Sequence, residues 1–359
     1  MLVVDAKIKI NNKEIDESIY VNLEKIKVSS SVDALDIAKV SFFDPDGKLQ
    51  ESSDFHIGKD ISISIGFDKY TDIFVGEVTR VDYIFDRRKT TIVRLICYDK
   101  LSKLAKMVHS RPFVKMKDSD IAKKMASEAG LQSSVDTTDK KHDYIFQNNE
   151  SNLSFLRRRA GRLGYELAIE EGKMIFKKAR FKDKKKSVEL SMYTDMIDFT
   201  VQIDASDIPE EVVVSSWDYV KKEGVEEIVK AGDEPKVGSA KSMGTKEVKS
   251  EMKNKTKFYR LDIPNLQNGE AKILAKAKLT DSSMEFIRAT GSCEGEPKIK
   301  SGKVIKIANL GKKLDGEYYI LSSEQIYTGL SYRTFFKVIS NGMHSSSSKK
   351  SASSSSEEC

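Results

Sequence analysis

Apolar and polar residues alternate along several short stretches of this chain, and two of these stretches share one pattern. In residues 58–98, isoleucines at 61, 63 and 65 alternate with polar residues, which places the isoleucines on one face of a strand. Strand-like runs follow at residues 74–85 and 91–98, and these runs are apolar on both faces. The stretch therefore predicts an antiparallel meander that is covered on both sides. Gly76 interrupts its middle strand and predicts a bend or bulge there.

A second stretch, residues 302–327, repeats this pattern near the other end of the chain. A shift of 244 positions (302 − 58) places Ile61 on Ile305 and Phe74 on Tyr318 without a gap. Two interpretations are open, because any two meanders can be aligned in this way and because a duplicated β-barrel domain would give the same result. Three copies of a chain with two such barrels would present a ring of six similar units.

The wider pattern divides the chain into three folded parts and a tail. Residues 1–105 contain short alternating runs separated by turn signals, which predict a first antiparallel β-barrel. Residues 106–200 predict a small α+β domain, and residues 201–343 predict a second, similar β-barrel. The expected fold class is mainly β with an α+β insertion. Residues 344–359 are rich in serine and lysine and are predicted to be disordered.

Two segments inside these parts carry more specific predictions. In the α+β part, Asp118 or Ser119 can cap a helix that Gly130 stops. A second helix is predicted over residues 151–164, because its apolar residues recur three and four positions apart. In the second barrel, residues 221–256 are rich in Lys, Glu, Gly and Ser and offer few apolar side chains to a core. We therefore predict that they form a long surface loop inserted into that barrel.

Composition fits a soluble globular protein with two or three domains. Of the 359 residues, 39% are hydrophobic and 32% are charged. No run approaches the roughly 18 apolar residues of a membrane span, and the first residues lack the pattern of a signal peptide, so Sec export is not expected. The net charge of +6 comes from lysines interspersed with acids, which favours a solvated surface over a nucleic-acid footprint.

The residue types that carry most catalytic and metal chemistry are scattered. An odd number of widely spaced cysteines argues against a disulfide framework or a zinc site. The histidines have no metal-ligand spacing and no evident nucleophile partner. These residues are Cys97, Cys293, Cys359, His56, His109, His142 and His344. We therefore predict no catalytic residue, no metal and no cofactor.

Adjacent acids and one arginine cluster remain as candidates. Acids stand side by side at 170–171, 210–211 and 226–227, but such pairs usually form solvated faces, and a glycosidase needs two carboxyls of opposed character in one cleft. Arg157, Arg158, Arg159 and Arg162 form a basic helix face. We favour ion pairs with neighbouring acids or with an adjacent subunit. Contact with phosphate or nucleic acid is the alternative, although no set of stacking aromatics accompanies the arginines.

Four motifs resemble the phage late-control gene D and VgrG family. The meander residues GKDI at 58–61 and IFVGEV at 73–78 resemble that family's first barrel, and CYDKL at 97–101 resembles its closing strand and aspartate. Residues 146–165, with QNNESNLSFL and AGRLGY, are similar to its most specific segment. LDGEYYI at 314–320 resembles a strand pair of its second barrel.

The resemblance implies a structural baseplate hub of a contractile tail in a phage, an R-type bacteriocin or a related injection particle. It implies a homotrimer that adapts a sixfold tail tube, or a tube-initiator protein, to a threefold spike. Other partners would be baseplate wedge proteins and a tape-measure protein. The chain would assemble in the bacterial cytoplasm and leave in a released particle.

This chain departs from longer family members after Asn341, where no OB-fold and no β-helix needle follow. The resemblance then implies that the spike is a separate polypeptide. Two alternatives stay open, a phage-type cell-wall hydrolase and a basic nucleic-acid-binding module. Hydrolysis of peptidoglycan that one carboxylate substitution abolishes would indicate the first alternative. Steep salt dependence of nucleic-acid binding would indicate the second.

Overall fold

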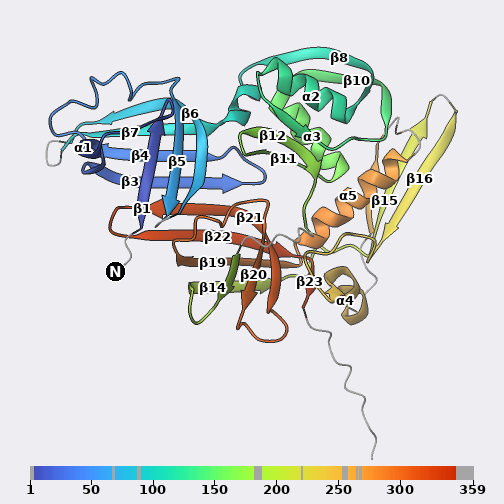
Figure 1. Ribbon diagram of the computed structural model, residues 1–359. Helices are drawn as coiled ribbons and strands as arrows, with labels where there is room; N and C mark the ends of the chain where they lie inside the picture. The colour runs from blue at the N-terminus through green and yellow to red at the C-terminus, as the bar shows by residue number, and fades with distance from the viewer. Residues whose placement is uncertain are drawn as a thin grey trace, which may run out of the picture.

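A computed structural model describes residues 4–66, 69–86, 90–181, 188–219, 221–252, 258–263, 266 and 269–344. Of the tail predicted at residues 344–359, only His344 is among the described residues. Cys359 lies outside them. The described chain is mainly β, with one large sheet and smaller α+β units beside it (Figure 1). Among the helices in these ranges, none is long and apolar enough to cross a membrane.

The large sheet contains 13 of the described strands and is built from both ends of the chain. Its main path runs β14-β19-β22-β21-β3-β4-β7-β6-β5-β1-β2, and β20 joins β13 to β21 beside this path. The early strands are β1 (Asp5–Ile10), β2 (Lys13–Glu14), β3 (Leu23–Ser31), β4 (Ile37–Phe43), β5 (Asp60–Gly66), β6 (Tyr70–Ile84) and β7 (Ile92–Asp99). The late strands are β13 (Val188–Ser191), β14 (Met196–Ile203), β19 (Ile287–Glu294), β20 (Val304–Ala308), β21 (Gly316–Tyr327) and β22 (Tyr332–Ser340).

Strand pairing reveals the same unit twice. In the first unit the strand order is β3-β4-β7-β6-β5, and in the second it is β14-β19-β22-β21-β20. Each unit has an extra, bulged residue at two matching places, Thr79 in β6 and Leu321 in β21, then Glu24 in β3 and Ile197 in β14. Because a bulge shifts the register locally, its recurrence at matching places is strong support for duplication.

A pair of backbone contacts recurs as well. The amide of Gly58 donates to the carbonyl of Val78, and the amide of Gly302 donates to that of Ile320, at 2.8 and 2.9 Å. Both glycines have φ near +80° (82° and 76°), a conformation that side chains disfavour. The glycine at the start of each meander is thus explained by backbone geometry.

The ungapped shift of 244 positions holds for only one strand of the meander. Ile61 pairs with Gly76 and Ile305 pairs with Tyr318, so Gly76 rather than Phe74 corresponds to Tyr318. The shift is 244 between β5 and β20 but 242 between β6 and β21 (318 − 76). A shift of two keeps every side chain on its face, which is why the hydrophobic pattern did not reveal it.

The two predicted β-barrels are not closed. Among the described residues, no strand pairing joins β1 or β5 back to β3, or β20 back to β14, and β3 pairs with β21 instead. The mainly β prediction is confirmed, but the duplicated units are parts of one continuous, largely antiparallel sheet. The prediction of closed barrels was wrong, because the alternation of apolar and polar residues indicates which face of a strand is buried and not which strands are neighbours.

Each unit buries its predicted apolar face in its own cluster. The alternating isoleucines of β5 lie in the first cluster with Phe42, Phe55 and Phe74. Their counterparts in β20, Ile305 and Ile307, lie in the second cluster. The first cluster also contains two tyrosines from the second unit, Tyr327 and Tyr332. The first unit therefore does not complete its core alone.

The α+β part packs two helices against a ribbon and a small sheet. Its elements are β8 (Val108–Lys117), α2 (Asp118–Glu128), β9 (Ser133–Val135), β10 (Lys141–Ser151), α3 (Asn152–Leu163), β11 (Tyr165–Glu170) and β12 (Lys173–Lys178). Both predicted helices are confirmed. Ser151 caps α3 by accepting from the amide of Ser154, and Gly164 ends it at φ 66°. Lys117, not Asp118 or Ser119, is the cap residue of α2, because both predicted residues are already helical.

Residues 221–252, predicted as a loop, contain regular structure. They include β16 (Glu223–Lys230), β17 (Ser242–Met243) and α4 (Gly244–Glu251), while residues 253–256 lie outside the described ranges. β16 pairs with β15 (Glu211–Asp218), which also pairs with β18 (Phe258–Asp262). Helix α5 (Glu270–Met284) covers one face of this small sheet. The prediction failed because Glu227 stands between Val225 and Val229 on the covered face and hides the alternation.

The remaining elements are short. They are α1 (Glu17–Tyr20), the 3-10 helix η1 (Lys100–Leu104) and β23 (Gly342–Met343). β23 pairs with β17, so the end of the described chain lies beside the segment that precedes α4.

Candidate functional site at the junctions of the fold

The basic face of α3 does not act as one surface. The Arg159 guanidinium pairs with Asp118, and Arg158 pairs with Glu150. For these two side chains the ion-pair interpretation is confirmed. Arg162 lines a cavity of about 610 Å³ between the α+β part and α5. In the part of the chain that the structure describes, the buried Nε and Nη2 of Arg157 have no hydrogen-bond partner.

A buried charge cluster holds the α+β part against α5. It comprises Asp118 at the start of α2, His142 in β10, Arg159 in α3 and Glu270 in α5. Asp118 Oδ2 lies 2.9 Å from both Arg159 Nη2 and His142 Nε2, and His142 Nδ1 lies 3.1 Å from Glu270 Oε1. Asp118 and Arg159 are only 2% and 6% exposed. Four elements far apart in sequence thus meet through one set of opposite charges.

The contacts within this cluster shift the pKa values of Asp118 and His142 in opposite directions. Burial would raise the pKa of Asp118, but hydrogen bonds from His142 and Arg159 outweigh burial and lower it to about 2. Burial would lower the pKa of His142, but its hydrogen bonds to Asp118 and Glu270 raise it. A carboxylate oxygen lies at each ring nitrogen of His142, so both nitrogens already have partners within the chain. The cluster is therefore a structural clamp and not a catalytic pair.

The other histidines show no catalytic arrangement. His344 is buried with its ring 5.6 Å from that of Tyr318, and burial lowers its pKa. His56 and His109 are not in the buried core. Across the described ranges, no group of three or more His, Cys, Asp or Glu could hold a metal ion. Cys97 and Cys293 are buried free thiols, and burial raises the pKa of each to about 12.

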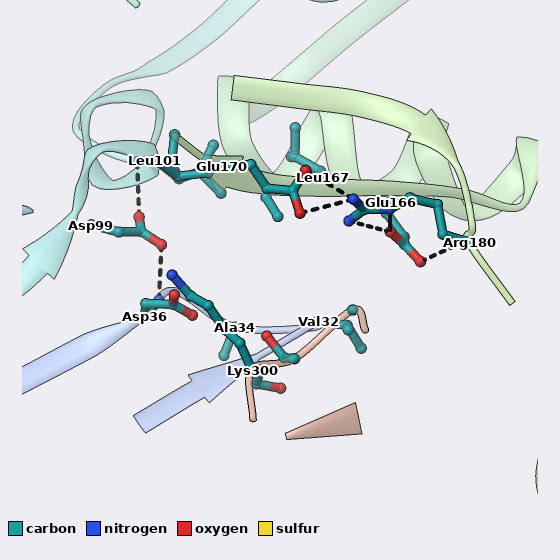
Figure 2. Close-up of a pocket in the computed structure, with 15 residues that line it drawn as sticks. Val32, Ala34, Asp36, Asp99, Leu101, Glu166, Leu167, Glu170, Arg180 and Lys300 are labelled. Atoms are coloured by element: carbon teal, nitrogen blue, oxygen red, sulfur yellow. Dashed lines mark hydrogen bonds and ion pairs between the residues drawn. The ribbon is translucent and has the colours of Figure 1, made fainter. Parts of the chain in front are cut away.

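A second junction joins three parts of the chain around a small cavity (Figure 2). Arg180 Nη1 lies 2.8 Å from Glu170, and Arg180 Nη2 lies 3.3 Å from Glu166. Lys303, just before β20, lies 2.8 Å from the same Glu170. The cavity volume of about 30 Å³ has room for roughly a water or two, so it is a joint and not a substrate pocket. The prediction that Glu170 belongs to a solvated acidic face is wrong, since it anchors this joint.

Asp99, which the sequence resemblance singled out, lies at the other end of this junction. Its Oδ1 accepts from the amide of Leu101 at 2.8 Å and caps η1, while its Oδ2 accepts from the amide of Asp36 at 2.9 Å (Figure 2). Burial raises the pKa of Asp99 to about 6, and this effect outweighs the hydrogen bonds from the amides of Asp36 and Leu101, which lower it. Asp99 thus fixes the exit of β7 to the start of β4 at an electrostatic cost.

This cost predicts a pH dependence of stability. The folded pKa of Asp99, about 6, lies above its ordinary value of 3.8, so the folded state is penalised when the carboxylate is charged. We expect protonation of Asp99 alone to add about 2–3 kcal/mol to the free energy of unfolding as pH falls from 7 to 4. Urea unfolding at several pH values measures this, with Asp99→Asn as the comparison. Equal pH dependence in both proteins would contradict the assignment.

Two free strand edges of the large sheet form a third candidate surface. Among the described strands, β14 pairs only with β19, and residues 80–84 of β6 pair only with β7. Exposed apolar side chains lie along both edges, with Phe85 71% exposed and Ile203 49% exposed. Free strand edges with apolar side chains are typical of surfaces that pair with another chain.

A family model described as the Alg8 N-terminal domain matches residues 1–326. The chain belongs to this family. The family name itself states no activity or partner. No curated protein matches the chain in sequence.

Several solved structures of other proteins share the fold of this chain. A 43 kDa tail protein of prophage MuSo2 from Shewanella oneidensis is similar over 95% of this chain and 99% of its own, with TM-score 0.68 and 15% identity. A tail protein from Neisseria meningitidis MC58 is similar over 95% and 98%, with TM-score 0.70 and 12% identity.

A third structure is the E. coli c3393 protein, described as a component of the type VI secretion system with structural similarity to the T4 bacteriophage tail proteins gp27 and gp5. The similarity covers 93% of this chain and 76% of the c3393 chain, with TM-score 0.62 and 10% identity. The resemblance to phage tail and VgrG proteins that the sequence motifs indicated is confirmed at the level of the fold.

Sequence reasoning missed both buried junctions. Asp118 and His142 are 24 residues apart, and Arg159 and Glu270 lie farther along the chain. No local pattern joins them, because each residue alone has the appearance of an ordinary surface charge. The only available signal was Arg159, which stands among the apolar residues of α3.

Proposed function

We propose that this chain is a structural hub subunit of a contractile tail or injection particle. Three copies would form a ring that adapts a sixfold tail tube to a threefold spike. The observation that carries this proposal is the duplicated unit, since three chains with two equivalent units each offer six similar surfaces to a hexameric tube. The shared fold with tail proteins over 95% of the chain supports it.

The proposal names several partners. The tail tube, or a tube-initiator protein, would contact one side of the ring, and a separate spike or tip protein would contact the other. Baseplate wedge proteins and a tape-measure protein are further expected partners. The subunit would assemble in the bacterial cytoplasm and become part of a released phage or phage-tail-like particle.

We further propose that the subunit is not an enzyme. Among the described residues, His142 contacts Asp118 in a buried cluster, but carboxylates occupy both of its ring nitrogens. The acids that stand side by side do not favour a hydrolase, since Glu170 is held by Arg180 and Lys303. Two of the four helix arginines are also paired within the chain, which weakens the nucleic-acid alternative.

The assembly state tests this function. We expect light scattering at micromolar concentration to give three times the chain mass of 40.4 kDa. Negative-stain class averages of the same sample should show a ring with a hole and a near-sixfold outline. A compact monomer at these concentrations would contradict the proposal, and peptidoglycan hydrolysis would then be the next assay.

A further inference from the structure

The contact between the two units inside one chain is the starting point. The second half of β21 pairs antiparallel with β3, from Ser322 opposite Ser31 to Tyr327 opposite Ile26. The side chains on the inner face of this contact are buried. Tyr327 is only 7% exposed and lies in the hydrophobic cluster of the first unit. The second unit thus supplies a strand and an aromatic side chain that the first unit needs.

The second unit has an equivalent of β3 in β14, and among the described residues no strand pairs with the outer edge of β14. Because the bulges match, Glu24 in β3 corresponds to Ile197 in β14, a shift of 173 positions (197 − 24). In the same way Thr79 corresponds to Leu321, so residues 80–85 correspond to residues 322–327 of β21. Each chain therefore carries one internal contact, β21 with β3, and the two unpaired halves of a second one.

The exposure of side chains differs between the internal contact of β21 with β3 and the two free edges. Phe85 corresponds to Tyr327, and it is 71% exposed where Tyr327 is buried. Ile203 corresponds to the buried Ser30 and is 49% exposed. Among the described residues, neither β14 nor residues 80–84 of β6 has a strand on its outer side. Positions that are buried in the internal contact are thus exposed and apolar in the free edges.

We propose that β14 of one copy pairs antiparallel with residues 80–85 of a second copy, in the register of the internal contact. This register sets Arg80 opposite Asp204 and Phe85 opposite Phe199. The inference rests on the proposed hub function and specifies the surface by which its copies join.

The side chains in this register are complementary. Three apolar pairs fall on the inner face, Val81 with Ile203, Tyr83 with Val201 and Phe85 with Phe199, and apolar cross-strand pairs stabilise antiparallel sheets. Arg80 and Asp204 add opposite charges at one end. The two edges are different surfaces of the chain, so the contact is head-to-tail and closes into a ring only if the rotation permits.

Disulfide trapping in the register tests the proposal. In a Cys359→Ser background, Ile84→Cys and Thr200→Cys introduce thiols that lie opposite each other on the outer face. Neighbouring strands place such residues about 4.5–5.5 Å apart at Cα, within the range of a disulfide. Under mild oxidation, a mixture of the two single variants should give a covalent dimer, and the double variant should give a covalent trimer.

The controls separate register from general proximity. Each single variant alone should stay uncrosslinked, because a head-to-tail contact never brings two copies of one position together. The pair Tyr83→Cys and Thr200→Cys should also fail, since adjacent positions in a strand point to opposite faces. Crosslinking of a single variant alone, or equal crosslinking of the mismatched pair, would overturn the proposed contact.

The outcome also separates this inference from the hub function. A trimer in light scattering without any disulfide between positions 84 and 200 would reject the strand contact and leave the hub proposal in place. A monomer without crosslinks would reject both. A crosslinked trimer would support the contact and the register together.

Discussion

Replacing Asp118 by asparagine should lower the free energy of unfolding by about 3–5 kcal/mol, because a buried ion pair that loses one partner leaves an uncompensated charge. Asparagine keeps the volume of the side chain. It removes the negative charge that compensates Arg159, which is 6% exposed and whose Nη2 lies 2.9 Å from Asp118. Urea unfolding followed by circular dichroism at pH 7 measures the effect.

A matched control is available at Arg158, the residue next to Arg159 in α3. Glu150→Gln removes the acid that pairs with Arg158, whose side chain is 45% exposed. Water can solvate that guanidinium, so we expect a loss of less than about 1 kcal/mol. Equal losses in the two variants would show that the cluster around Asp118 is not a buried clamp.

Replacing Phe85 by serine should weaken assembly strongly and leave the isolated chain as stable as before. Phe85 is exposed in the single chain, so its removal changes the folded and unfolded states alike. At the proposed contact it would be buried, and burying a phenylalanine side chain contributes about 2–3 kcal/mol. This corresponds to a roughly 30- to 150-fold higher dissociation constant per contact, which sedimentation velocity over a concentration series can measure.

Tyr327 holds the equivalent position in the internal contact between β21 and β3, and its substitution should affect folding instead of assembly. Tyr327 is buried in the first unit's core, so Tyr327→Ser should lower the stability of the single chain by about 2–4 kcal/mol. Substitution by serine thus has different effects at the two positions. It should weaken assembly at Phe85 and lower the stability of the single chain at Tyr327. Unchanged assembly of Phe85→Ser would argue against burial of this side chain between copies.

Local pattern was enough to predict much of this protein. The alternating isoleucines of β5 and β20 are buried as expected, because a strand has a period of two whatever surrounds it. The helix end at Gly164 followed from backbone sterics that act within a few residues. The similarity between residues 58–98 and 302–327 pointed to duplication before any pairing was known.

Other features depended on contacts between distant residues. The two-residue difference between the units and the matching bulges appear only when strands are paired, since neither changes which face is apolar. The Asp118 cluster required four separate elements to meet. The alternation in β16 was masked by one glutamate. The sequence by itself determined the buried faces of β5 and β20 and the end of α3, and it indicated the repeat, because these depend on neighbours along the chain. Only the tertiary structure decided the open sheet, the clamp and the two free edges, because these depend on which distant strands and charges become neighbours in space.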